Sequence, residues 1–336
     1  MDSIPVLILV GPTASGKTEL LQELFDGRNG LGLPPAEIVS ADSMQAYRGM
    51  DIGTAKPGPE ALARLPHRLI DIRDPDEQYT AGDFVRLADE ACAEITASGR
   101  FPVVSGGTGF YVRNFIHGLP GGPAAETEVR AAVARDLAEK GETVLRAELA
   151  AVDPESAARI ATRDTYRLTR AVEILRQTGR APSEFAPPSM PRAGYDFLVV
   201  EAARPREVLY RRIDARVDAM FERGLADEVA ALRAAGYGPE APGMKAIGYS
   251  EFFGIGPAAG RFRELAEKDL RAIAEAIKLD TRRYAKRQET FFRAFAGRKV
   301  LSLEGEGGPS PGNVEELRAL VAGFLERLKR RDPALP

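Results

Sequence analysis

The sequence of 336 residues contains a single cysteine, Cys92, and only two histidines, His67 and His117. One thiol cannot form an internal disulfide, and so few cysteine and histidine side chains argue against a metal site built from them. No apolar stretch reaches the roughly 18 residues that a membrane-spanning helix requires. The start of the chain also lacks the charged region and cleavage site of a signal peptide. These absences predict a cytoplasmic protein with no membrane attachment, and we expect a monomer.

The composition, with 44% hydrophobic and 28% charged residues, is sufficient for a substantial core, and the length favours two domains. The net charge of −3 gives no sign of a nucleic-acid-binding protein. However, the basic residues are distributed unevenly, and two local clusters of arginine and lysine become important below.

Short apolar runs rich in β-branched residues recur along the chain and alternate with helical patterns. This alternation predicts an α/β fold in which helices cover both faces of a parallel sheet, with ligands bound at the carboxyl ends of the strands. The runs are VLILV (6–10), EIVS (37–40), RLIDI (68–72), FPVVS (101–105), YDFLVVE (195–201) and KVLSL (299–303).

The alternation stops between the fourth and fifth runs, where residues 122–193 contain no strand-like segment. We predict that this region is a small all-helical insertion domain and that residues 1–121 and 194–336 form the core domain. Apolar residues at helical spacing further predict one helix over 205–235, a second over 266–295 and a final amphipathic helix over 312–331.

The clearest motif is GPTASGKT at residues 11–18, which matches the phosphate-binding pattern G-x-x-x-x-G-K-[ST] and directly follows the first apolar run. Backbone N–H groups of such a loop and of the following helix form a cradle for an anion. Lys17 is expected to reach the outer phosphate, and Thr18 to bind Mg²⁺ through its hydroxyl. The motif predicts a P-loop NTPase-like sheet, although its physics requires only a polyphosphate.

The residues that a nucleotide hydrolase needs are much harder to find. Asp71 and Asp74 are candidates for the magnesium-binding carboxylate, but RLIDIRDPDEQY is equally typical of a solvated acidic loop. His67 is interpreted as a hydrogen-bonded structural residue. A strong phosphate loop without a clear hydrolytic apparatus suggests that the polyphosphate is a leaving group and not an energy source.

Two further segments follow predicted strands. Asp42 lies at the end of the second strand, where its carboxylate could accept a proton from an attacking group or could cap a helix over SMQAY, and the sequence favours neither. Ser43 and Gln45 can hydrogen-bond a base edge. In SGGTGFY the glycines indicate a close backbone approach, with Thr108 offering a hydroxyl, although a tight strand-to-helix turn explains them equally well.

Basic residues gather in two places. Arg163, Arg167 and Arg170 have the spacing of one helical face in the insertion. Residues 278–299 contain eight basic and two acidic side chains, a local charge of +6. In an acidic chain, two such clusters indicate a large anionic partner, and the unstacked bases of an RNA loop would suit a site that admits one nucleotide. The aromatic residues Tyr284, Phe291 and Phe295 are interpreted as core.

Taken together, these segments resemble the tRNA dimethylallyltransferase family, also called bacterial tRNA isopentenyltransferases. The motifs occur in order over residues 11–293. They are GPTASGKT, SADSMQAYRGMDIGTAKP, HRLIDI, GGTGFY, DTYRLTRAVEILRQTGR, RIDARVDAMFERGLADEV, MKAIGYSE and TRRYAKRQETFFR.

The resemblance implies an enzyme that transfers the dimethylallyl group of dimethylallyl diphosphate to N6 of the adenosine on the 3′ side of the anticodon, position 37. It implies Mg²⁺ as cofactor, the anticodon stem-loop of tRNA as partner, and Asp42, Lys17 and Thr108 as catalytic residues. The implied diphosphate-binding residues are Gly11, Pro12, Thr13, Ala14, Ser15, Gly16, Lys17, Thr18 and Arg216. The implied tRNA-binding residues are Asp42, Ser43, Met44, Gln45, Thr108, Arg130, Tyr166, Arg167, Leu168, Thr169, Arg170, Arg282, Arg283, Lys286 and Arg287.

The chain departs from the family pattern at Arg163-Asp164, where the family usually shows Asn-Asp, and at Asp280, where Asn is more common. Three other functions are compatible with parts of the sequence. A small-molecule P-loop kinase would explain the loop and Asp42 but not the arginine clusters. A prenyltransferase of free AMP or ADP would not need the arginines of the insertion. A non-catalytic RNA-binding NTPase fold would not need Asp42.

Overall fold

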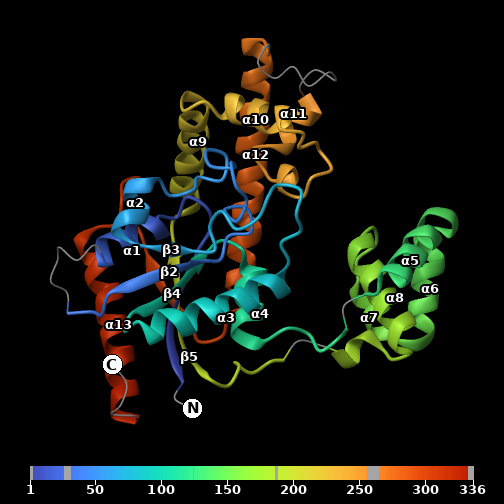
Figure 1. Cartoon of the computed structure of the whole chain (residues 1–336), viewed down its shortest axis with the longest axis horizontal. Coiled ribbons are helices and arrows are strands. Elements are labelled where there is room, and N and C mark those ends of the chain that lie inside the picture. Colours follow the sequence, from blue (N-terminus) through green and yellow to red (C-terminus); the bar gives the residue numbers. More distant parts are fainter. Residues whose placement is uncertain (1–2, 26–31, 124, 186–187, 256–264, 332–336) are drawn as a thin grey trace. The chain divides into compact units, whose positions relative to one another are not determined.

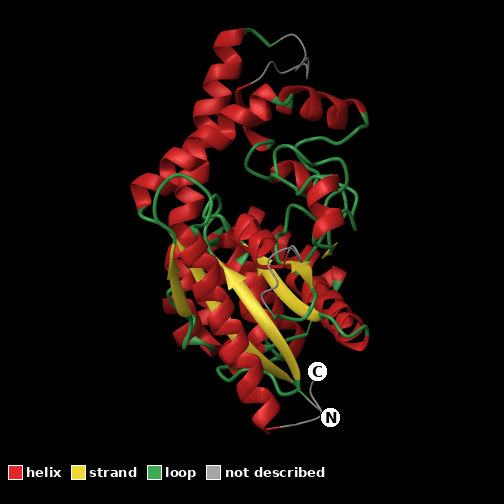
Figure 2. Cartoon of the chain, turned by 90° about the vertical axis from the view of Figure 1, so that its left-hand side faces the viewer, coloured by secondary structure: helices red, strands yellow, loops and turns green. Residues whose placement is uncertain are grey.

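The core of the protein is a sheet of six parallel strands in the order β3-β2-β4-β1-β5-β6. The computed structural model describes residues 3–25, 32–123, 125–185, 188–255 and 265–331. The predicted α/β fold is confirmed, because every strand pairs in parallel and helices flank the sheet (Figure 2). The strands are β1 (Ile4–Val10), β2 (Ala36–Ser40), β3 (His67–Arg68), β4 (Phe101–Gly106), β5 (Tyr195–Ala203) and β6 (Lys299–Ser302).

Both faces of the sheet are buried, as expected of parallel strands. Leu7 and Leu9 of β1 point to the face covered by α1 (Lys17–Phe25) and α13 (Pro311–Arg331), which run side by side in Figure 1. Val6 and Ile8 point the other way, toward α3 (Ala81–Ala97) and α4 (Gly109–His117). Apolar residues at every position of β1 therefore serve two separate hydrophobic layers.

The helices that follow β5 and precede β6 pack together beyond the carboxyl ends of the strands. The single helix predicted over 205–235 is wrong, because α9 (Arg206–Glu222) and α10 (Leu225–Ala234) are separate. Gly224 adopts φ 93°, a left-handed conformation that ends the first helix and turns the chain. The predictions for 266–295 and 312–331 are confirmed by α12 (Glu267–Phe292) and α13.

The apolar run RLIDI was expected to form a strand, but only His67 and Arg68 pair with β2. Leu69 and Asp71 both have positive φ angles, of 65° and 55°, which are incompatible with an extended strand. The buried side chain of Leu69 explains the apolar pattern without a strand. Two short helices, α2 (Pro59–Arg64) and α11 (Ser250–Ile255), and the 3₁₀ turn η2 (Gly243–Lys245) complete this unit.

Residues His117–Pro191 form a second compact unit, where the sequence placed an all-helical insertion over 122–193. Its helices surround a small core of their own that includes Val133, Leu145, Leu149, Leu168 and Val172. The elements are α5 (Thr127–Lys140), α6 (Glu142–Val152), α7 (Pro154–Arg159), α8 (Thr165–Thr178) and the 3₁₀ turn η1 (Pro182–Phe185). Across the part of the chain that the structure describes, no helix has the length and hydropathy needed to cross a membrane.

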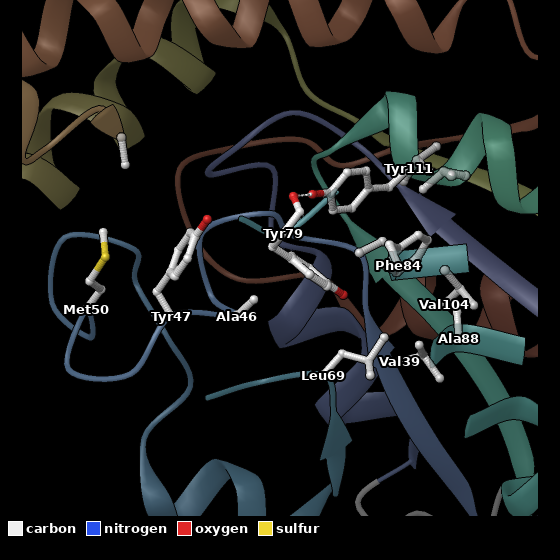
Figure 3. Close-up of a cluster of buried hydrophobic side chains, with 14 of the residues drawn as sticks. Val39, Ala46, Tyr47, Met50, Leu69, Tyr79, Phe84, Ala88, Val104 and Tyr111 are labelled. Atoms are coloured by element: carbon white, nitrogen blue, oxygen red, sulfur yellow. Dashed lines mark hydrogen bonds between the residues drawn. The ribbon is translucent and has the colours of Figure 1, made fainter. Parts of the chain in front are cut away.

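Part of the larger core is a cluster of buried side chains in which Tyr79, Phe84 and Tyr111 lie with Val39 of β2 and Val104 of β4 (Figure 3). Phe84 stacks on Tyr111 with ring centroids 4.9 Å apart, and the Tyr111 hydroxyl donates a 2.6 Å hydrogen bond to the backbone oxygen of Tyr79. This hydrogen bond satisfies the buried hydroxyl of Tyr111, and the ring contacts of Tyr111 with Phe84 and Tyr79 hold α3 and α4 to the segment that follows β3.

We predict that Phe84→Ala lowers the free energy of unfolding by about 3–5 kcal/mol, because it removes a fully buried ring from this cluster. Urea unfolding followed by circular dichroism measures the change. Val300→Ala is the control, since that side chain is 49% exposed and should cost well under half as much. Equal losses in the two variants would contradict the assignment of this cluster as the principal core.

Candidate active site

The loop Gly11–Thr18 connects β1 to α1, as the motif predicts. Gly16 and Ala14 have positive φ angles, of 102° and 62°, which turn successive peptide groups around the loop. The Lys17 ammonium group donates hydrogen bonds to the backbone oxygens of Gly11 and Pro12 at 2.8 and 2.9 Å. The lysine therefore folds back over its own loop and holds it closed.

A cavity of about 330 Å³ lies next to this loop, within the larger unit. It is polar at the end formed by the loop and apolar along the wall formed by α9 and α12. The polar lining includes Thr13, Lys17, Thr18, Glu19, Asp42, Ser43, Gln45, Arg216, Thr281, Tyr284 and Gln288. The apolar lining includes Met44, Ile213, Val217, Met220, Ala246, Ile247 and Ile277.

Two cationic side chains, Lys17 and Arg216, line the cavity. Burial, and then the positive charge of Arg216, lower the pKa of Lys17 to about 8. Burial likewise lowers the pKa of Arg216, whose guanidinium lies 3.5 Å from the Thr13 hydroxyl. Two enclosed positive charges repel each other and lack the solvation of bulk water. An anion bound between them would relieve both effects, so this end of the cavity is suited to phosphate.

Asp42 follows β2 and borders the same cavity as Lys17. Its Oδ1 atom accepts hydrogen bonds from the N–H groups of Met44 at 2.9 Å and Gln45 at 3.4 Å. The alternative in which Asp42 caps a helix over SMQAY is wrong, because residues 43–46 form a turn. The carboxylate caps that turn through one oxygen and still borders the cavity, so a structural and a chemical role coexist.

The segment after β4 packs tightly against the segment after β2. A Cβ atom on Gly106 would lie 2.1 Å from the Ala41 backbone oxygen, so only glycine fits at this position. The Thr108 hydroxyl accepts a 3.0 Å hydrogen bond from the Ser43 N–H. Gly106 and Gly107 line the cavity whereas Thr108 does not, and Thr108 contacts Ser43, which does.

Gln288 of α12 joins the phosphate loop to the segment that follows β4. Its Oε1 accepts the N–H of Thr13 at 2.9 Å, and its Nε2 donates to the backbone oxygen of Gly107 at 2.8 Å. One turn earlier, Tyr284 lines the cavity, where burial and the charge of Asp42 raise its pKa to about 12. The prediction that Tyr284 belongs to the core is therefore wrong, whereas Phe295 is buried as expected.

Gln288 is absent from the site residues predicted from the sequence. The signal that could have found it was its position at helical spacing with Ile273 and Ile277, on the face of α12 that should be apolar. A polar side chain on a buried face requires a hydrogen-bonding partner, and here it has two.

A second missed residue, Glu228 of α10, holds the segment Asp51–Gly53 in place. Its carboxylate accepts the N–H groups of Asp51, Ile52 and Gly53 at 3.0, 2.7 and 3.1 Å, and the Tyr249 hydroxyl at 2.6 Å. Gly53, Thr54 and Ala55 then form one border of the cavity. The Glu228 carboxylate thus brings together three motifs that are distant in sequence, DIGTAKP, GLADEV and AIGYSE.

The acidic segment after β3 has a different role. Asp71 forms an ion pair with Lys56 at 2.6 Å, and Asp74 forms one with Arg48 at 2.8 Å. Neither carboxylate lines the cavity, so neither is placed to hold a metal there. His67 donates a 2.7 Å hydrogen bond from Nδ1 to the Leu65 backbone oxygen, and burial lowers its pKa, as expected of a structural residue.

The basic cluster of α12 carries less free charge than its composition indicates. Arg282 pairs with Asp214 at 2.7 Å, Arg283 with Asp280 at 3.0 Å, and Lys278 with Asp218 at 2.7 Å. Arg287 lies over the Tyr284 ring at 5.6 Å, and Lys286 is exposed with no ion-pair partner in the described ranges. Lys286 and Arg287 are therefore the residues of this cluster best able to attract an external anion.

In the insertion unit, Arg163 precedes α8 and does not share its helical face, which corrects the expected three-arginine stripe. Arg167 is exposed and pairs with Asp164 at 2.8 Å, and Arg170 donates to the Pro123 backbone oxygen at 2.6 Å. Tyr166 is 82% exposed, whereas the Leu168 side chain is buried in the core of the unit. Arg130 is exposed on α5 and Thr169 is half-buried.

The parallel sheet, the phosphate-binding loop between β1 and α1, and the enclosed cations define a P-loop protein. The sequence model of the IPP transferase family matches residues 45–295. The chain belongs to this family, and the resemblance inferred from its motifs is confirmed.

Similar proteins cover almost the full length of the chain. The tRNA dimethylallyltransferase of Geobacter sulfurreducens is 43% identical over 95% of this chain and 96% of its own, and tRNA dimethylallyltransferase 2 of Geotalea uraniireducens is 45% identical over 87% and 90%. The crystal structure of the full-length tRNA isopentenylpyrophosphate transferase of Bacillus halodurans is 34% identical, with a TM-score of 0.69 over 98% of this chain and 99% of that one. A eukaryotic dimethylallyltransferase, 24% identical with a TM-score of 0.74 over 98% of this chain and 80% of that one, shares the fold.

The lowered pKa of Lys17 makes stability depend on pH. In the unfolded chain the ammonium group loses its proton near its ordinary pKa of 10.5, whereas in the folded protein it does so near 8. Between these values the unfolded state binds more protons, so the free energy of unfolding should rise with pH. We predict that raising the pH from 8 to 9.5 adds about 1.6 kcal/mol through this group.

Urea unfolding of wild type and Lys17→Met over this pH range measures the contribution. The variant should lack the rise, because methionine does not titrate. Lys329→Met, at an exposed position of α13, should keep it. A pH dependence identical in wild type and Lys17→Met would show that Lys17 has an ordinary pKa.

Proposed function

We propose that the protein transfers the dimethylallyl group of dimethylallyl diphosphate to N6 of adenosine 37 in tRNA, beside the anticodon, and releases diphosphate. The observation that carries this proposal is the cavity, which combines a cationic phosphate loop, an apolar wall and the carboxylate of Asp42. The names of the relatives, tRNA dimethylallyltransferases over nearly their whole length, support the same reaction.

The phosphate loop and its neighbours would bind the diphosphate. The backbone N–H groups of Gly16, Lys17 and Thr18, together with the side chains of Lys17 and Arg216, are fixed in place before the reaction. Negative charge grows on the diphosphate as the bond from carbon to oxygen breaks, so preorganised positive groups stabilise the transition state more than the ground state.

The residues at the end of the cavity next to α1 also fit a magnesium ion. Thr18 offers a hydroxyl, and Asp42 and Glu19 supply carboxylate oxygens to the same lining, the kind of donor that Mg²⁺ prefers. In the described part of the chain there is no group of three or more histidine, cysteine or acidic side chains that could hold a metal. Thr18 would thus bind Mg²⁺ jointly with the diphosphate oxygens. When bound, the ion neutralises charge on the leaving group.

The apolar wall would hold the five-carbon group. Ile213, Val217 and Met220 of α9 and Ile277 of α12 line the cavity together. Their side chains would pack against the dimethylallyl chain and exclude water from its reactive carbon, which has cationic character during transfer.

Asp42 would be the general base. The exocyclic amine of adenine is a weak nucleophile, because its lone pair is delocalised into the ring. Removal of the N–H proton by the carboxylate as the new bond forms is typically worth about 10²- to 10⁴-fold in rate. Ser43 and Gln45, which line the cavity together with Asp42, would contact the adenine ring of the substrate.

Contacts with the rest of the tRNA would come from each unit separately. In the larger unit these are Asp42–Gln45, Thr108 and the α12 residues Arg282, Arg283, Lys286 and Arg287. In the insertion unit they are Arg130 and Tyr166–Arg170, where the side chain of Leu168 supports the helix from the core.

The proposed reaction is tested with the purified protein, Mg²⁺, dimethylallyl diphosphate and tRNA, followed by mass spectrometry of the nucleosides. We expect a dimethylallyl group on one adenosine. Parallel reactions contain AMP or ADP in place of tRNA, and ATP with small metabolites in place of the prenyl donor. Modification of free nucleotides alone, or phosphoryl transfer without a prenyl donor, would refute the proposal.

The role of Asp42 is tested with Asp42→Asn, which retains the oxygen that caps the turn but cannot accept a proton. We predict that transfer falls about 10²- to 10⁴-fold while tRNA affinity stays near that of wild type. Asp76→Asn, at an exposed position outside the cavity, is the matched control. Wild-type turnover in Asp42→Asn would exclude the general-base role.

The exposed cations of α12 are tested with the double variant Lys286→Gln/Arg287→Gln. We predict weaker tRNA binding and a shallower dependence of affinity on salt, with the slope reduced by up to about two, because each phosphate contact releases counterions. Arg271→Gln, at the other end of α12, is the control. Filter binding between 50 and 200 mM salt, roughly the range over which such effects are large, measures the slope. A slope unchanged from wild type would place the tRNA elsewhere.

A further inference from the structure

Arg204, the residue that follows β5, is almost completely buried behind the phosphate loop, with 6% of its surface exposed. Among the residues that the structure describes, its guanidinium donates hydrogen bonds to backbone oxygens and to no side chain. Nε contacts the oxygen of Ser15 at 2.7 Å, Nη2 contacts that of Gly307 at 2.8 Å, and Nη1 contacts those of Glu304 and Gly305.

Arg212 of α9 makes similar contacts beside it. Its Nε donates to the backbone oxygen of Ala14 at 2.9 Å, and its Nη1 donates to that of Gly307 at 2.9 Å. The two arginines therefore connect consecutive carbonyl groups of the phosphate loop to the segment 304–307, which lies between β6 and α13. This segment, which we call the strap, lies behind the loop and does not line the cavity.

These contacts determine where the loop's donors point. In a trans peptide the C=O and N–H bonds point in opposite directions. Because Arg204 holds the Ser15 oxygen behind the loop, the N–H of Gly16 is directed to the opposite side, and Gly16 lines the cavity. The arginine thus fixes one of the hydrogen-bond donors of the anion cradle before any ligand binds.

The charge of Arg204 has no acidic partner in the described part of the chain. Glu19, the nearby carboxylate, pairs with Arg212 at 2.9 Å. Burial lowers the pKa of Arg204 and the positive charge of Arg212 lowers it further, whereas the carboxylate of Glu19 raises it to a smaller extent. Buried charges in proteins are usually paired, because an isolated one is costly. A Cβ atom on Gly16 would lie 3.2 Å from Nη2, so this charge lies directly against the loop.

We propose that Arg204 is a positioning residue for the diphosphate, which fixes the Ser15–Gly16 peptide and supplies unpaired positive charge from behind the phosphate loop. Diphosphate as the ligand rests on the proposed function. Arg204 does not touch the ligand. It acts through the loop, and the negative charge of the diphosphate compensates for a charge that the free protein leaves unpaired.

The test is the binding of inorganic pyrophosphate with Mg²⁺, measured by isothermal titration calorimetry. Arg204→Lys keeps the charge but replaces the planar fork of five N–H donors with an ammonium group that has three, whereas Arg204→Gln loses the charge and keeps two N–H donors. We expect Arg204→Gln to bind at least about tenfold more weakly than wild type, and Arg204→Lys to stay within about threefold. Arg211→Gln is the control, since Arg211 is exposed and pairs with Glu306 of the strap.

Each outcome decides the proposal. If Arg204→Lys and Arg204→Gln weaken pyrophosphate binding equally, the role of charge is overturned and Arg204 only holds the loop in shape. If both variants bind pyrophosphate as tightly as wild type, the whole proposal is overturned. If wild type itself binds no pyrophosphate, the proposed function and the role of Arg204 are both overturned. If wild type binds pyrophosphate but transfers no dimethylallyl group to tRNA, the result counts against the proposed function alone.

A second measurement uses the wild-type protein and so does not depend on how the variants fold. Hydrogen exchange read by mass spectrometry reports peptides that cover the loop and peptides that cover residues 299–310. We expect pyrophosphate to slow exchange in both, because compensation of the Arg204 charge stabilises its contacts with the strap. Slowed exchange in the loop with an unchanged strap would contradict the proposal.

Discussion

The candidate site depends on one constraint: several cationic side chains are enclosed together, and too few carboxylates lie beside them to balance their charge. Lys17 and Arg216 face the cavity, and both have lowered pKa values. Arg204 adds a third cation behind the loop. Such an arrangement is unfavourable in the free protein and becomes favourable when a polyanion binds. The rest of the larger unit can be understood as the scaffold that holds these charges close together.

That scaffold works because parallel strands bring their carboxyl ends to one edge of the sheet. The phosphate loop follows β1, Asp42 follows β2, the glycine segment follows β4 and Arg204 follows β5. Helices then join these separate loops to one another. Gln288 of α12 connects the loops after β1 and β4, and Glu228 of α10 fixes the segment Asp51–Gly53. The anion cradle, the proposed base and the apolar wall therefore form one rigid cavity.

Features encoded by local patterns were predictable from the sequence. The loop motif requires glycine and lysine at fixed spacing, so the residue types alone identify Gly11–Thr18 as the phosphate loop. The apolar runs predicted the strands, because a strand that is buried on both faces of a sheet needs apolar residues at successive positions. The same logic failed at RLIDI, where Leu69 is buried from a turn, and at Gly224, where one glycine divides a helical pattern. In both cases backbone conformation overrode periodicity.

The sequence alone determined the family, the P-loop, the carboxylate at position 42 and the composition of the basic clusters, because each is a local pattern of residue types. Only the tertiary structure decided which charges are free and which side chains meet. It pairs Arg282 with Asp214, 68 residues away, and it leaves Arg204 among carbonyl groups from two distant segments. Contacts across such separations depend on how helices pack on the sheet, and no spacing rule within one segment encodes them.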